Sequence, residues 1–562
     1  MEFRVKKRDG SGRIGELKLN GEKVITPNIF FVDTNRFKPP KFANIIITNE
    51  NKEKIKPGLK YSEELLIQKI KYRYDSLYII DHAKQIMSQP KKFVDNIVNL
   101  REEIGYQKAI YIPSVGNPTN LALLTYLGID LFDSTFAIIA ARNNSLLFEI
   151  GMFNKNDLEE NPCNCPLCIN NKKPKDMSFQ EILNHNYYAL FNEIKHVRNA
   201  IQQDNLRNLL ENRTKSDPNL TAILRNLDRN HYNYLEKRTP IQSKSVLIAT
   251  TSEALNRPEI KRFQNRLIER YMKPKSAKIL LLLPCSAKKP YSFSKSHKLF
   301  REKILATNNP FIVHEVIITS PIGVVPRDLE LVYPPSSYDI PVTGIWDEQE
   351  KNMITELLSK YLKQNKYEII ISHLPEDLNE FVNPILNKPI LTCKNNPKTN
   401  ESLEKLYDTL SSIVNNFEKI KAQKRAIEDI ESLATYQFGK KIAKNLLQDV
   451  FIKGKYPYQK IIKNNIQLGM TTKDRGLISL TLNGAEQLID SKMYWLEIYD
   501  DFKLIGSIFA PGVKNADSEI RVGDEVIVLK NDKLVAVGVA QMNGEEMKKS
   551  YHGEAVKVRH RV

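Results

Sequence analysis

Hydrophobic positions alternate between strand-like runs and helical spacing through the first part of the chain. Apolar runs at 109–113 and 136–141 predict strands, and apolar residues at helical spacing predict helices over 62–87 and 120–127. Residues 181–227 keep helical spacing almost throughout. Alternating strands and helices are typical of parallel β/α units, in which the working residues lie at strand ends.

A second region of alternation begins near residue 278. Apolar runs at 279–283, 314–319 and 368–372 predict buried strands, and 348–364 is the clearest helix between them. The helical and highly charged stretch 403–428 follows a polar boundary and predicts a connecting element.

The last part of the chain changes in character. Short strands separated by glycine turns begin at Met493 and predict a small β-barrel. The patterns together predict a multidomain chain of α/β and α+β parts. Its segments are a β/α domain over 1–272, an α/β core domain over 273–400, a helical connector over 401–428, a small α+β domain over 429–490 and a β-barrel over 491–562.

The charge balance favours an anionic partner. The 562 residues include 84 Lys and Arg against 66 Asp and Glu, a net charge of +18, which favours nucleic acid through phosphate neutralisation. Lysines spread over solvated helix faces would give the same balance. No apolar run reaches the roughly 18 residues of a membrane span, and the first residues lack the apolar core of a signal peptide. We therefore expect a cytoplasmic protein without a membrane partner.

Three of the five cysteines fall within six positions, which indicates a metal site rather than disulfides. Cys163, Cys165 and Cys168 can turn around one ion, and Zn²⁺ prefers four such ligands in a tetrahedron. His185 is the favoured fourth ligand, with His196 as the alternative. Four protein ligands leave no open position, so the predicted zinc site is structural.

A second cysteine, Cys285, follows the predicted strand 279–283, at the edge where α/β folds expose working groups. Basic neighbours would lower the pKa of its thiol and raise the fraction of nucleophilic thiolate. The alternative is a buried cysteine with a polar loop behind it. The neighbours that suit chemistry are Lys288 and Lys289 as cations, Tyr291 and Ser294 as hydrogen-bond donors, and His297 as a proton carrier.

Three short segments resemble the tRNA-guanine transglycosylase family. They are GIDLFDS at 128–134, the CxCxxC segment, and LNHN at 183–186. The resemblance implies a TIM-type β/α barrel, truncated or degenerate here, with a zinc site of three Cys and one His. It also implies that Asp133 occupies the position of the family's nucleophile.

The segment from Pro284 to His297 resembles the signature of the archaeosine synthase family, and so do residues 320–330 and 338–347. The resemblance implies action on tRNA carrying 7-cyano-7-deazaguanine at position 15. Lysine would add to the nitrile to form an amidine-linked adduct, which a separate radical-SAM partner then splits. By charge and loop position, the candidate substrate ligands are Arg327, Glu330 and Asp339, which ordinary ion pairing would explain equally well.

The residues around Cys285 suit such chemistry. A thiolate can add to a nitrile carbon to give a thioimidate, and an amine can then displace the sulfur to leave an amidine. Our hypothesis is that Cys285 is this nucleophile, with Lys289 or His297 protonating the nitrile nitrogen.

The C-terminal segment resembles the PUA domain of RNA-modifying enzymes, which implies binding of structured tRNA. Residues 436–439 and 472–484 resemble the small domain that precedes it in archaeal transglycosylases. The candidate RNA ligands are Phe509, Pro511, Gly512, Lys514 and Arg559, against the alternative of an exposed basic edge strand.

Two other functions stay open from the sequence. One is base exchange by a transglycosylase that uses Asp133, and the other is a non-catalytic subunit that holds tRNA. The sequence also leaves the oligomeric state open, a homodimer included.

Overall fold

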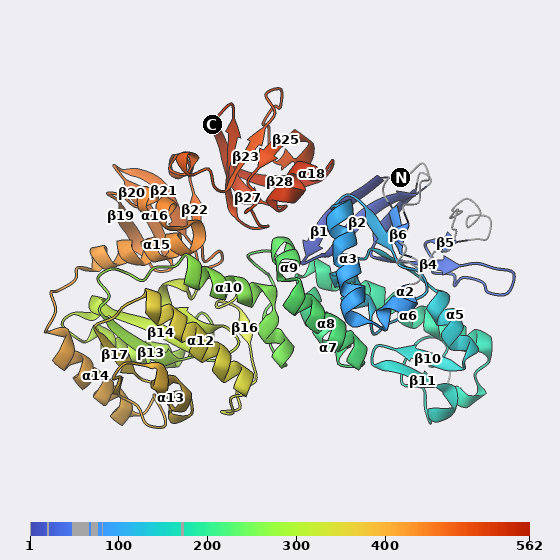
Figure 1. Cartoon of the computed structure of the whole chain (residues 1–562), viewed down its shortest axis with the longest axis horizontal. Helices are drawn as coiled ribbons and strands as arrows, with labels where there is room; N and C mark the ends of the chain where they lie inside the picture. The colour runs from blue at the N-terminus through green and yellow to red at the C-terminus, as the bar shows by residue number, and fades with distance from the viewer. Residues whose placement is uncertain (1, 20–21, 48–66, 69–76, 81–82, 170–172) are drawn as a thin grey trace. The chain divides into compact units, whose positions relative to one another are not determined.

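A computed structural model of the whole chain describes residues 2–19, 22–47, 67–68, 77–80, 83–169 and 173–562 (Figure 1). The chain forms two compact units. The first comprises Met1–Pro240, Phe509–Pro511 and Glu546–Glu554, and the second comprises Ile241–Ile508, Gly512–Glu545 and Ala555–Val562.

The described part of the first unit contains two larger sheets and the antiparallel pair β10 (Ser145–Phe148) and β11 (Gly151–Asn154). An antiparallel sheet is formed by β1 (Glu2–Asp9), β2 (Gly12–Leu19) and β3 (Glu22–Thr26). A six-stranded sheet has the order β5 (Ile46–Ile47), β4 (Asn28–Val32), β9 (Leu131–Asp133), β8 (Ala109–Tyr111), β7 (Leu77–Ile80) and β6 (Ile67–Gln68). Its four central strands are parallel. Within the described ranges no ladder joins β5 to β6, so the sheet is open there and the predicted TIM-type barrel is not confirmed.

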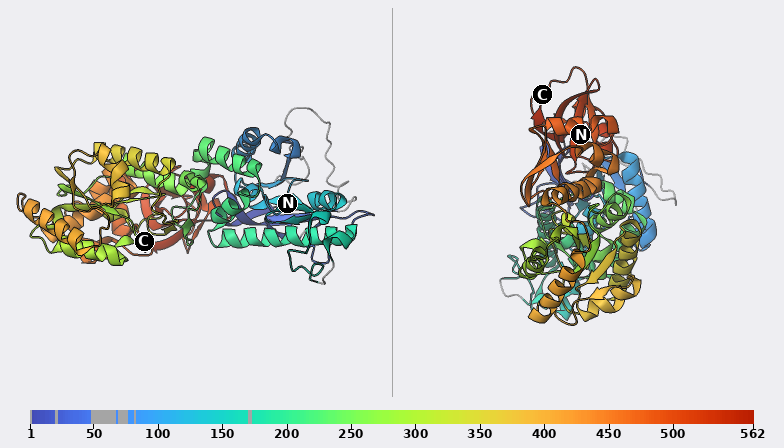
Figure 2. Two further views of the ribbon diagram at one scale, coloured as in Figure 1. Left: turned by 90° about the horizontal axis from the view of Figure 1, so that it is seen from below. Right: turned by 90° about the vertical axis from the view of Figure 1, so that its left-hand side faces the viewer.

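Helices surround this sheet, and the long helix α6 packs on β1, β2 and β4 (Figure 2). The predicted helical stretch 181–227 is confirmed as parts of three helices. The helices of the unit are α2 (Ala83–Met87), α3 (Pro90–Ile104), α4 (Leu121–Tyr126), α5 (Thr135–Arg142), α6 (Phe179–Gln202), α7 (Leu206–Thr214), α8 (Pro218–Asn230) and α9 (Tyr232–Arg238).

Two predictions in this unit need correction. The apolar run 136–141 lies in helix α5, because its alanines favour a helix and a short apolar run does not distinguish the two states. The strand precedes it, as β9. Much of the predicted helix 62–87 lies outside the described residues, and Leu77–Ile80 within it forms β7 with alternating burial.

The second unit contains a five-stranded sheet in the order β15 (Gly323–Pro326), β14 (Val313–Thr319), β13 (Ile279–Pro284), β17 (Ile369–Ser372) and β18 (Ile390–Leu391). The last four are parallel, and β15 is antiparallel to β14. All five leucines and isoleucines of β13 are fully buried, as expected for a central strand covered on both faces. The strands predicted at 279–283, 314–319 and 368–372 are confirmed.

Helices cover this sheet and continue beyond it. They are α10 (Pro258–Glu269), α11 (Lys295–Leu305), α12 (Glu348–Gln364), α13 (Glu376–Val382), α14 (Asn400–Val414), α15 (Ala422–Phe438) and α16 (Lys440–Leu446). The segment expected to be a connector holds most of α14, whose Leu403, Leu406 and Leu410 pack into one core with Ile279 and Leu281. Helix α14 is therefore part of the α/β core rather than a link after it.

Two further sheets complete the chain. The first has the order β19 (Phe451–Lys455), β20 (Tyr458–Lys463), β21 (Ile466–Thr471) and β22 (Ile478–Leu480), followed by α17 (Leu482–Glu486). The C-terminal sheet has the order β24 (Ile508–Phe509), β28 (Glu554–Arg561), β27 (Lys533–Ala540), β26 (Glu525–Lys530), β23 (Trp495–Ile498) and β25 (Val513–Ala516). Among all described residues, no helix is long and apolar enough to cross a membrane.

Candidate active site and candidate metal centre

Cys285 lies at the carboxyl edge of the five-stranded sheet, directly after β13. Its neighbour Pro284 pairs with Ile318 of the parallel strand β14, so Thr319 ends at the same edge. The thiol of Cys285 is hydrogen-bonded to the side chain of Thr319, and the residue is half-buried. The predicted strand-end position of Cys285 is confirmed.

Burial shifts the pKa of this thiol against the predicted direction. It raises the pKa of Cys285, and this outweighs the opposing effects of Thr319 and the Lys289 ammonium group. Burial also lowers the pKa of Lys289. Burial at this edge therefore offsets the lowering of the thiol pKa that the basic neighbours predict.

A chain of buried hydroxyl groups lies beside the thiol. Thr319 Oγ1 lies 2.5 Å from the Tyr338 hydroxyl, which lies 2.7 Å from the Tyr291 hydroxyl. The Lys289 ammonium group stands 4.0 Å from the centre of the Tyr338 ring. Tyr338 belongs to β16 (Tyr338–Asp339), which pairs with β12 (Leu247–Ile248).

Sequence reasoning missed Thr319 and Tyr338 as site residues. Thr319 ends the predicted strand 314–319, so the shared edge of parallel strands was the signal that could have found it. For Tyr338 the signal was weaker, because β16 is only two residues long. Its position depends on pairing with Leu247, which is distant in the sequence.

His297 does not occupy the position of a proton carrier. Its Nε2 lies 3.0 Å from the Pro284 carbonyl oxygen, and its Nδ1 lies 2.7 Å from a guanidinium nitrogen of Arg327. Burial and the Arg327 charge lower the pKa of His297 to about 3. The neutral ring thus donates from Nε2 to Pro284 and accepts at Nδ1 from Arg327, so both nitrogens are occupied and the ring positions the strand end.

Ser294 also has a structural partner. It is the N-cap of α11, and its hydroxyl accepts the backbone N–H of His297 at 3.2 Å. An N-cap side chain satisfies a free backbone donor at a helix start. Ser294 therefore holds the helix that carries His297.

Two of the three candidate substrate ligands lie in an internal ion-pair network. Glu330 is fully buried and accepts from Arg327 at 2.8 Å, from the Tyr456 hydroxyl at 2.6 Å and from the Ser292 backbone N–H at 3.0 Å. Arg327 also donates to Glu315 at 2.6 Å. These contacts favour the ion-pairing alternative for Arg327 and Glu330.

Asp339 differs from this pair because its side chain is exposed. It sits at the end of β16, next to Tyr338, and its charge acts on Lys289. Among the three candidates, Asp339 is thus the one placed to meet a ligand at the Cys285 edge.

The three clustered cysteines and His185 converge in the first unit. His185 Nδ1 lies 3.4, 3.6 and 3.4 Å from the sulfurs of Cys163, Cys165 and Cys168. All four ligand atoms lie within 4.8 Å of one another. The ring comes from α6, whose first turn carries a capping box between Ser178 and Glu181.

This donor set fits a tetrahedral metal ion. Bonds of about 2.3 Å to sulfur and about 2.0 Å to nitrogen place the two ligand atoms roughly 3.6 Å apart in a tetrahedron. His185 Nε2 also lies 3.1 Å from the Leu147 carbonyl oxygen, which fixes the proton on Nε2 and leaves Nδ1 free to bind. The prediction of His185 over His196 as the fourth member of the cluster agrees with this geometry.

Asp133, the candidate nucleophile of base exchange, is a buried acceptor. It is 3% exposed at the end of β9. Its carboxylate accepts from the Tyr111 hydroxyl at 2.6 Å and from the backbone N–H groups of Ser114 and Thr135 at 3.1 and 2.9 Å. The geometry gives it a structural part in holding the loop after β8.

The C-terminal RNA candidates divide into two groups. Phe509, Pro511 and Lys514 are exposed, and Lys514 forms an ion pair with Glu497 at 2.9 Å. Gly512 is buried, and a Cβ there would meet the Phe502 ring at 2.4 Å. Arg559 donates to the buried Glu525 at 3.2 Å and to the Leu480 carbonyl at 2.7 Å, so it is less available to phosphate than predicted.

Three family profiles match the chain. One described as queuine tRNA-ribosyltransferase matches residues 64–219, one described as a PUA domain matches residues 503–562, and one described as a domain of unknown function, DUF5591, matches residues 260–410. The last range, 260–410, contains Cys285 and the residues described around it. Tyr456, which donates to Glu330, and the strand β12 lie outside this range.

Curated relatives match most of the chain. The archaeosine synthase of Haloferax volcanii is 33% identical, with 99% of each chain covered. The archaeosine synthase subunit alpha of Methanosarcina acetivorans is 38% identical over 87% of this chain and 80% of the relative. A tRNA-guanine(15) transglycosylase of Methanobrevibacter smithii is 28% identical over 84% of this chain and 69% of the relative.

Among solved structures, a protein described as of unknown function matches 54% of this chain and 99% of its own. The identity is 26% and the TM-score is 0.43, which is too weak a likeness to establish a fold.

Proposed function

The chain belongs to the archaeosine synthase family, and we propose that it adds lysine to the nitrile of 7-cyano-7-deazaguanine in tRNA. The product is an amidine-linked adduct in archaeosine biosynthesis. The relatives support the coarser statement that the protein is a tRNA-modifying enzyme. The lysine chemistry is our proposal and is argued from the Cys285 edge.

The observation that carries the proposal is the pairing of one thiol with one amine at a strand end. Cys285 and Lys289 act on each other electrostatically, and Thr319 is hydrogen-bonded to the sulfur. A subunit that only holds tRNA has no use for a thiol, a lysine amine and a chain of buried hydroxyl groups placed together at one strand end.

In the first step, the neutral form of Lys289, which its lowered pKa makes more accessible, takes the proton of the Cys285 thiol and becomes an ammonium group. The sulfur then attacks the nitrile carbon. A C–S bond forms while one π bond of the nitrile breaks toward nitrogen. Lys289 then protonates that nitrogen, which leaves a thioimidate.

In the second step, the lysine substrate's amine attacks the thioimidate carbon. The C–S bond breaks, and the proton lost by the attacking amine returns through Lys289 to the sulfur. The two steps sum to addition of an amine N–H across the nitrile, so no oxidant or reductant is required.

His297, Arg327 and Glu330 serve this proposal as positioning residues. His297 holds the Pro284 carbonyl next to the nucleophile, and Arg327 holds His297. Of the two proton donors that the sequence left open, His297 has both nitrogens occupied, whereas Lys289 has no hydrogen bond among the described residues.

The four-ligand cluster of the first unit is proposed to hold structural Zn²⁺. The ion would be held by Cys163, Cys165, Cys168 and His185. It would cross-link the cysteine loop to α6, and four protein ligands would leave no open coordination position. The exposed Phe509, Pro511 and Lys514 are proposed to meet tRNA. The radical-SAM partner and a homodimer stay predictions.

The test is incubation of the purified protein with lysine and nitrile-bearing tRNA, followed by nucleoside mass analysis. We expect the mass gain of one lysine from the native protein and from the matched control Cys393→Ala, whose cysteine is buried elsewhere. Cys285→Ala should lose at least about 10³-fold in rate, the scale of removing a covalent nucleophile. No mass gain from the native protein would favour the tRNA-holding alternative.

A further inference from the structure

The second unit contains a cavity that the proposed chemistry does not use. Its volume is about 220 Å³, which is room for a small molecule. It lies among α11, the start of β14, α15 and the 3₁₀ turn η6 (Arg327–Leu329). Its apolar wall includes Ile304, Phe311, Val313, Leu331 and Leu433.

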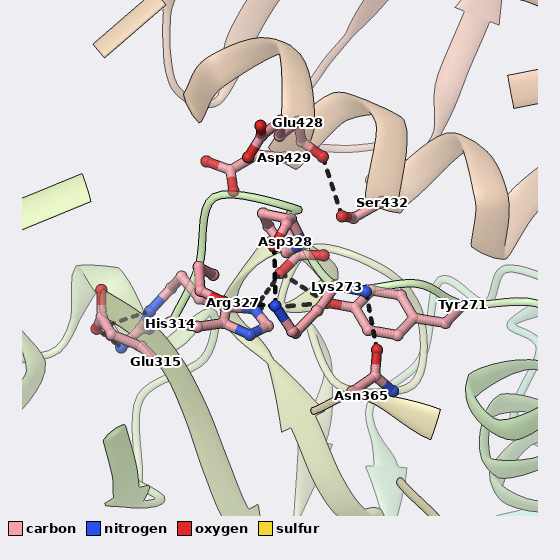
Figure 3. A network of polar contacts seen from close by, with 12 residues as sticks. Tyr271, Lys273, His314, Glu315, Arg327, Asp328, Asn365, Glu428, Asp429 and Ser432 are labelled. Carbon is pink, nitrogen blue, oxygen red and sulfur yellow. Dashed lines mark hydrogen bonds and ion pairs between the residues drawn. The ribbon is translucent and has the colours of Figure 1, made fainter. Parts of the chain in front are cut away.

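Six charged residues also line this cavity. The acidic ones are Glu315, Asp328 and Asp429, and the basic ones are Arg301, Arg327 and Arg425. Figure 3 shows Asp429 on α15 facing the turn that carries Arg327 and Asp328. A long apolar wall with charges of both signs suits a small aliphatic molecule that is itself charged.

Two of the three carboxylates form close ion pairs with arginines. Glu315 pairs with Arg327 at 2.6 Å, and Asp429 pairs with Arg425 at 2.6 Å. Among the described residues, Asp328 has no arginine or lysine at ion-pair distance, although the charge of Arg425 acts on it.

Oδ1 of Asp328 accepts from the Tyr271 hydroxyl at 3.2 Å and lies 3.0 Å from His314 Nε2. Burial lowers the pKa of His314, so its ring is neutral. The Asp328 side chain is only 3% exposed. Its other oxygen, Oδ2, is buried and has no hydrogen-bond partner among the described residues. An unpaired buried carboxylate is costly and calls for a cationic partner.

Asp429 adds to this negative end of the cavity. Its side chain lines the cavity and is 39% exposed, so the carboxylate is reachable from there.

Arg301 supplies the opposite charge. It lies on α11 and lines the cavity, where its charge acts on Glu315. Within the described ranges it has no close hydrogen bond or ion pair, so its guanidinium group can meet a carboxylate on a ligand.

We propose that this cavity binds a small aliphatic amino acid with its side-chain ammonium group against Asp328 and Asp429 and its carboxylate toward Arg301. An anion such as phosphate fits worse, because Arg327 and Arg425 are already paired and three carboxylates face the space. The choice of lysine as the probe rests on the proposed function. The preference for a ligand with an ammonium group is inferred from the carboxylates that line the cavity.

The cavity is connected to the Cys285 edge through one side chain. Arg327 lines the cavity and also donates to His297, which donates to the Pro284 carbonyl next to Cys285. A ligand in the cavity therefore touches the residue that holds the strand end in place.

Binding to the full chain without tRNA is the direct test, by isothermal titration calorimetry. L-lysine and 6-aminohexanoate should bind, and norleucine, which lacks the terminal ammonium group, should bind at least tenfold more weakly. Asp429→Asn should weaken lysine binding about tenfold, while Glu431→Gln on the same helix, paired with Lys275 outside the cavity, should not. Asp328→Asn should weaken lysine binding as much as Asp429→Asn does. If the variant at the buried Asp328 fails to fold, the variant at the more exposed Asp429 still tests the proposal.

Several results would overturn the proposal. They are no binding at millimolar lysine, equal binding of norleucine, tighter binding of inorganic phosphate, or lysine binding that Cys285→Ala abolishes and Asp429→Asn leaves intact. Adduct formation separates this proposal from the proposed function. Native adduct formation by a protein whose lysine binding Asp429→Asn leaves unchanged would remove the cavity alone, and cavity binding without any adduct would remove the function alone.

Discussion

The chain places cysteine in two contrasting surroundings, in its two units. In the first unit, three thiols meet one imidazole nitrogen at 3.4 to 3.6 Å, a spacing suited to a shared metal ion. In the second unit, a single thiol stands beside one lysine and one threonine, and burial raises its pKa. The comparison teaches that the surroundings of a thiol decide which role can be proposed for it, a metal ligand in the first unit and a nucleophile in the second.

The two sites also differ in how far apart their parts lie in the sequence. Cys163 and His185 are separated by 22 positions. The Tyr291–Tyr338 contact spans 47 positions, and the Glu330–Tyr456 contact spans 126. The metal cluster is local, whereas the Cys285 site exists only when distant segments fold together.

The largest expected effect is on the metal cluster. Cys168→Ala should abolish binding of one Zn²⁺ per chain and unfold the first unit, since structural zinc contributes on the order of 10 kcal/mol. Metal analysis with circular dichroism measures both. Cys393→Ala is the control, and a folded, zinc-loaded Cys168→Ala protein would remove the contrast between the two sites.

The next effect concerns the network under the Cys285 edge. Glu330→Gln leaves a buried Arg327 with one carboxylate fewer, and we expect a loss of about 3 kcal/mol in the free energy of unfolding. Urea titration measures it. Asp339→Asn, at an exposed site, should change it by less than about 0.5 kcal/mol. A loss that small from Glu330→Gln would show that Glu330 does not stabilise the fold.

Much of the local structure followed from the sequence alone. The strands at 279–283 and 314–319 were identified because central parallel strands are continuous apolar runs. The cysteine cluster and His185 were identified because a metal loop is encoded by short spacing. The strand before Cys285 placed the thiol at the correct sheet edge.

The failures have physical causes as well. An apolar run such as 136–141 fits a buried strand or a buried helix equally well. Only its alanines and the N-cap position before it favour the helix that forms. The pKa of Cys285 was predicted to fall because basic neighbours are visible in the sequence while burial is not. His297 was predicted to carry a proton, but its Nδ1 accepts a hydrogen bond from Arg327. Arg327 lies 30 positions away, so the sequence did not indicate this contact.

The third effect is on thiol reactivity. Because the pKa of Cys285 is raised, its alkylation by iodoacetamide should quicken nearly tenfold per pH unit between pH 7 and 9. Lys289→Ala removes a cation that stabilises the thiolate, so the pKa should rise further and alkylation at pH 8 should slow about tenfold. Peptide mass analysis follows Cys285 by itself.

Lys288→Ala is the matched control for that change, because Lys288 is the adjacent, exposed lysine. It should leave the alkylation rate within about twofold. Equal slowing in both variants would mean that general surface charge, rather than the Lys289 contact, acts on the thiol.

The smallest effect concerns the hydroxyl chain. Tyr338→Phe removes the partner of Thr319 and Tyr291 while keeping the ring under Lys289, so adduct formation should fall about fivefold, the equivalent of one hydrogen bond of about 1 kcal/mol. Single-turnover kinetics measure it. A loss as large as that of Cys285→Ala would make the hydroxyl, rather than the sulfur, the central group.

The central claim is that the sulfur of Cys285 bonds to the nitrile carbon, and it is tested most directly with the lysine donor left out. Nitrile-bearing tRNA is mixed with the protein, quenched over a time course and digested, and the peptide containing Cys285 is weighed. We predict a peptide carrying the modified nucleotide, which disappears when lysine is added. An unmodified peptide at every time point, in a preparation that forms the lysine adduct at its normal rate, would contradict the account.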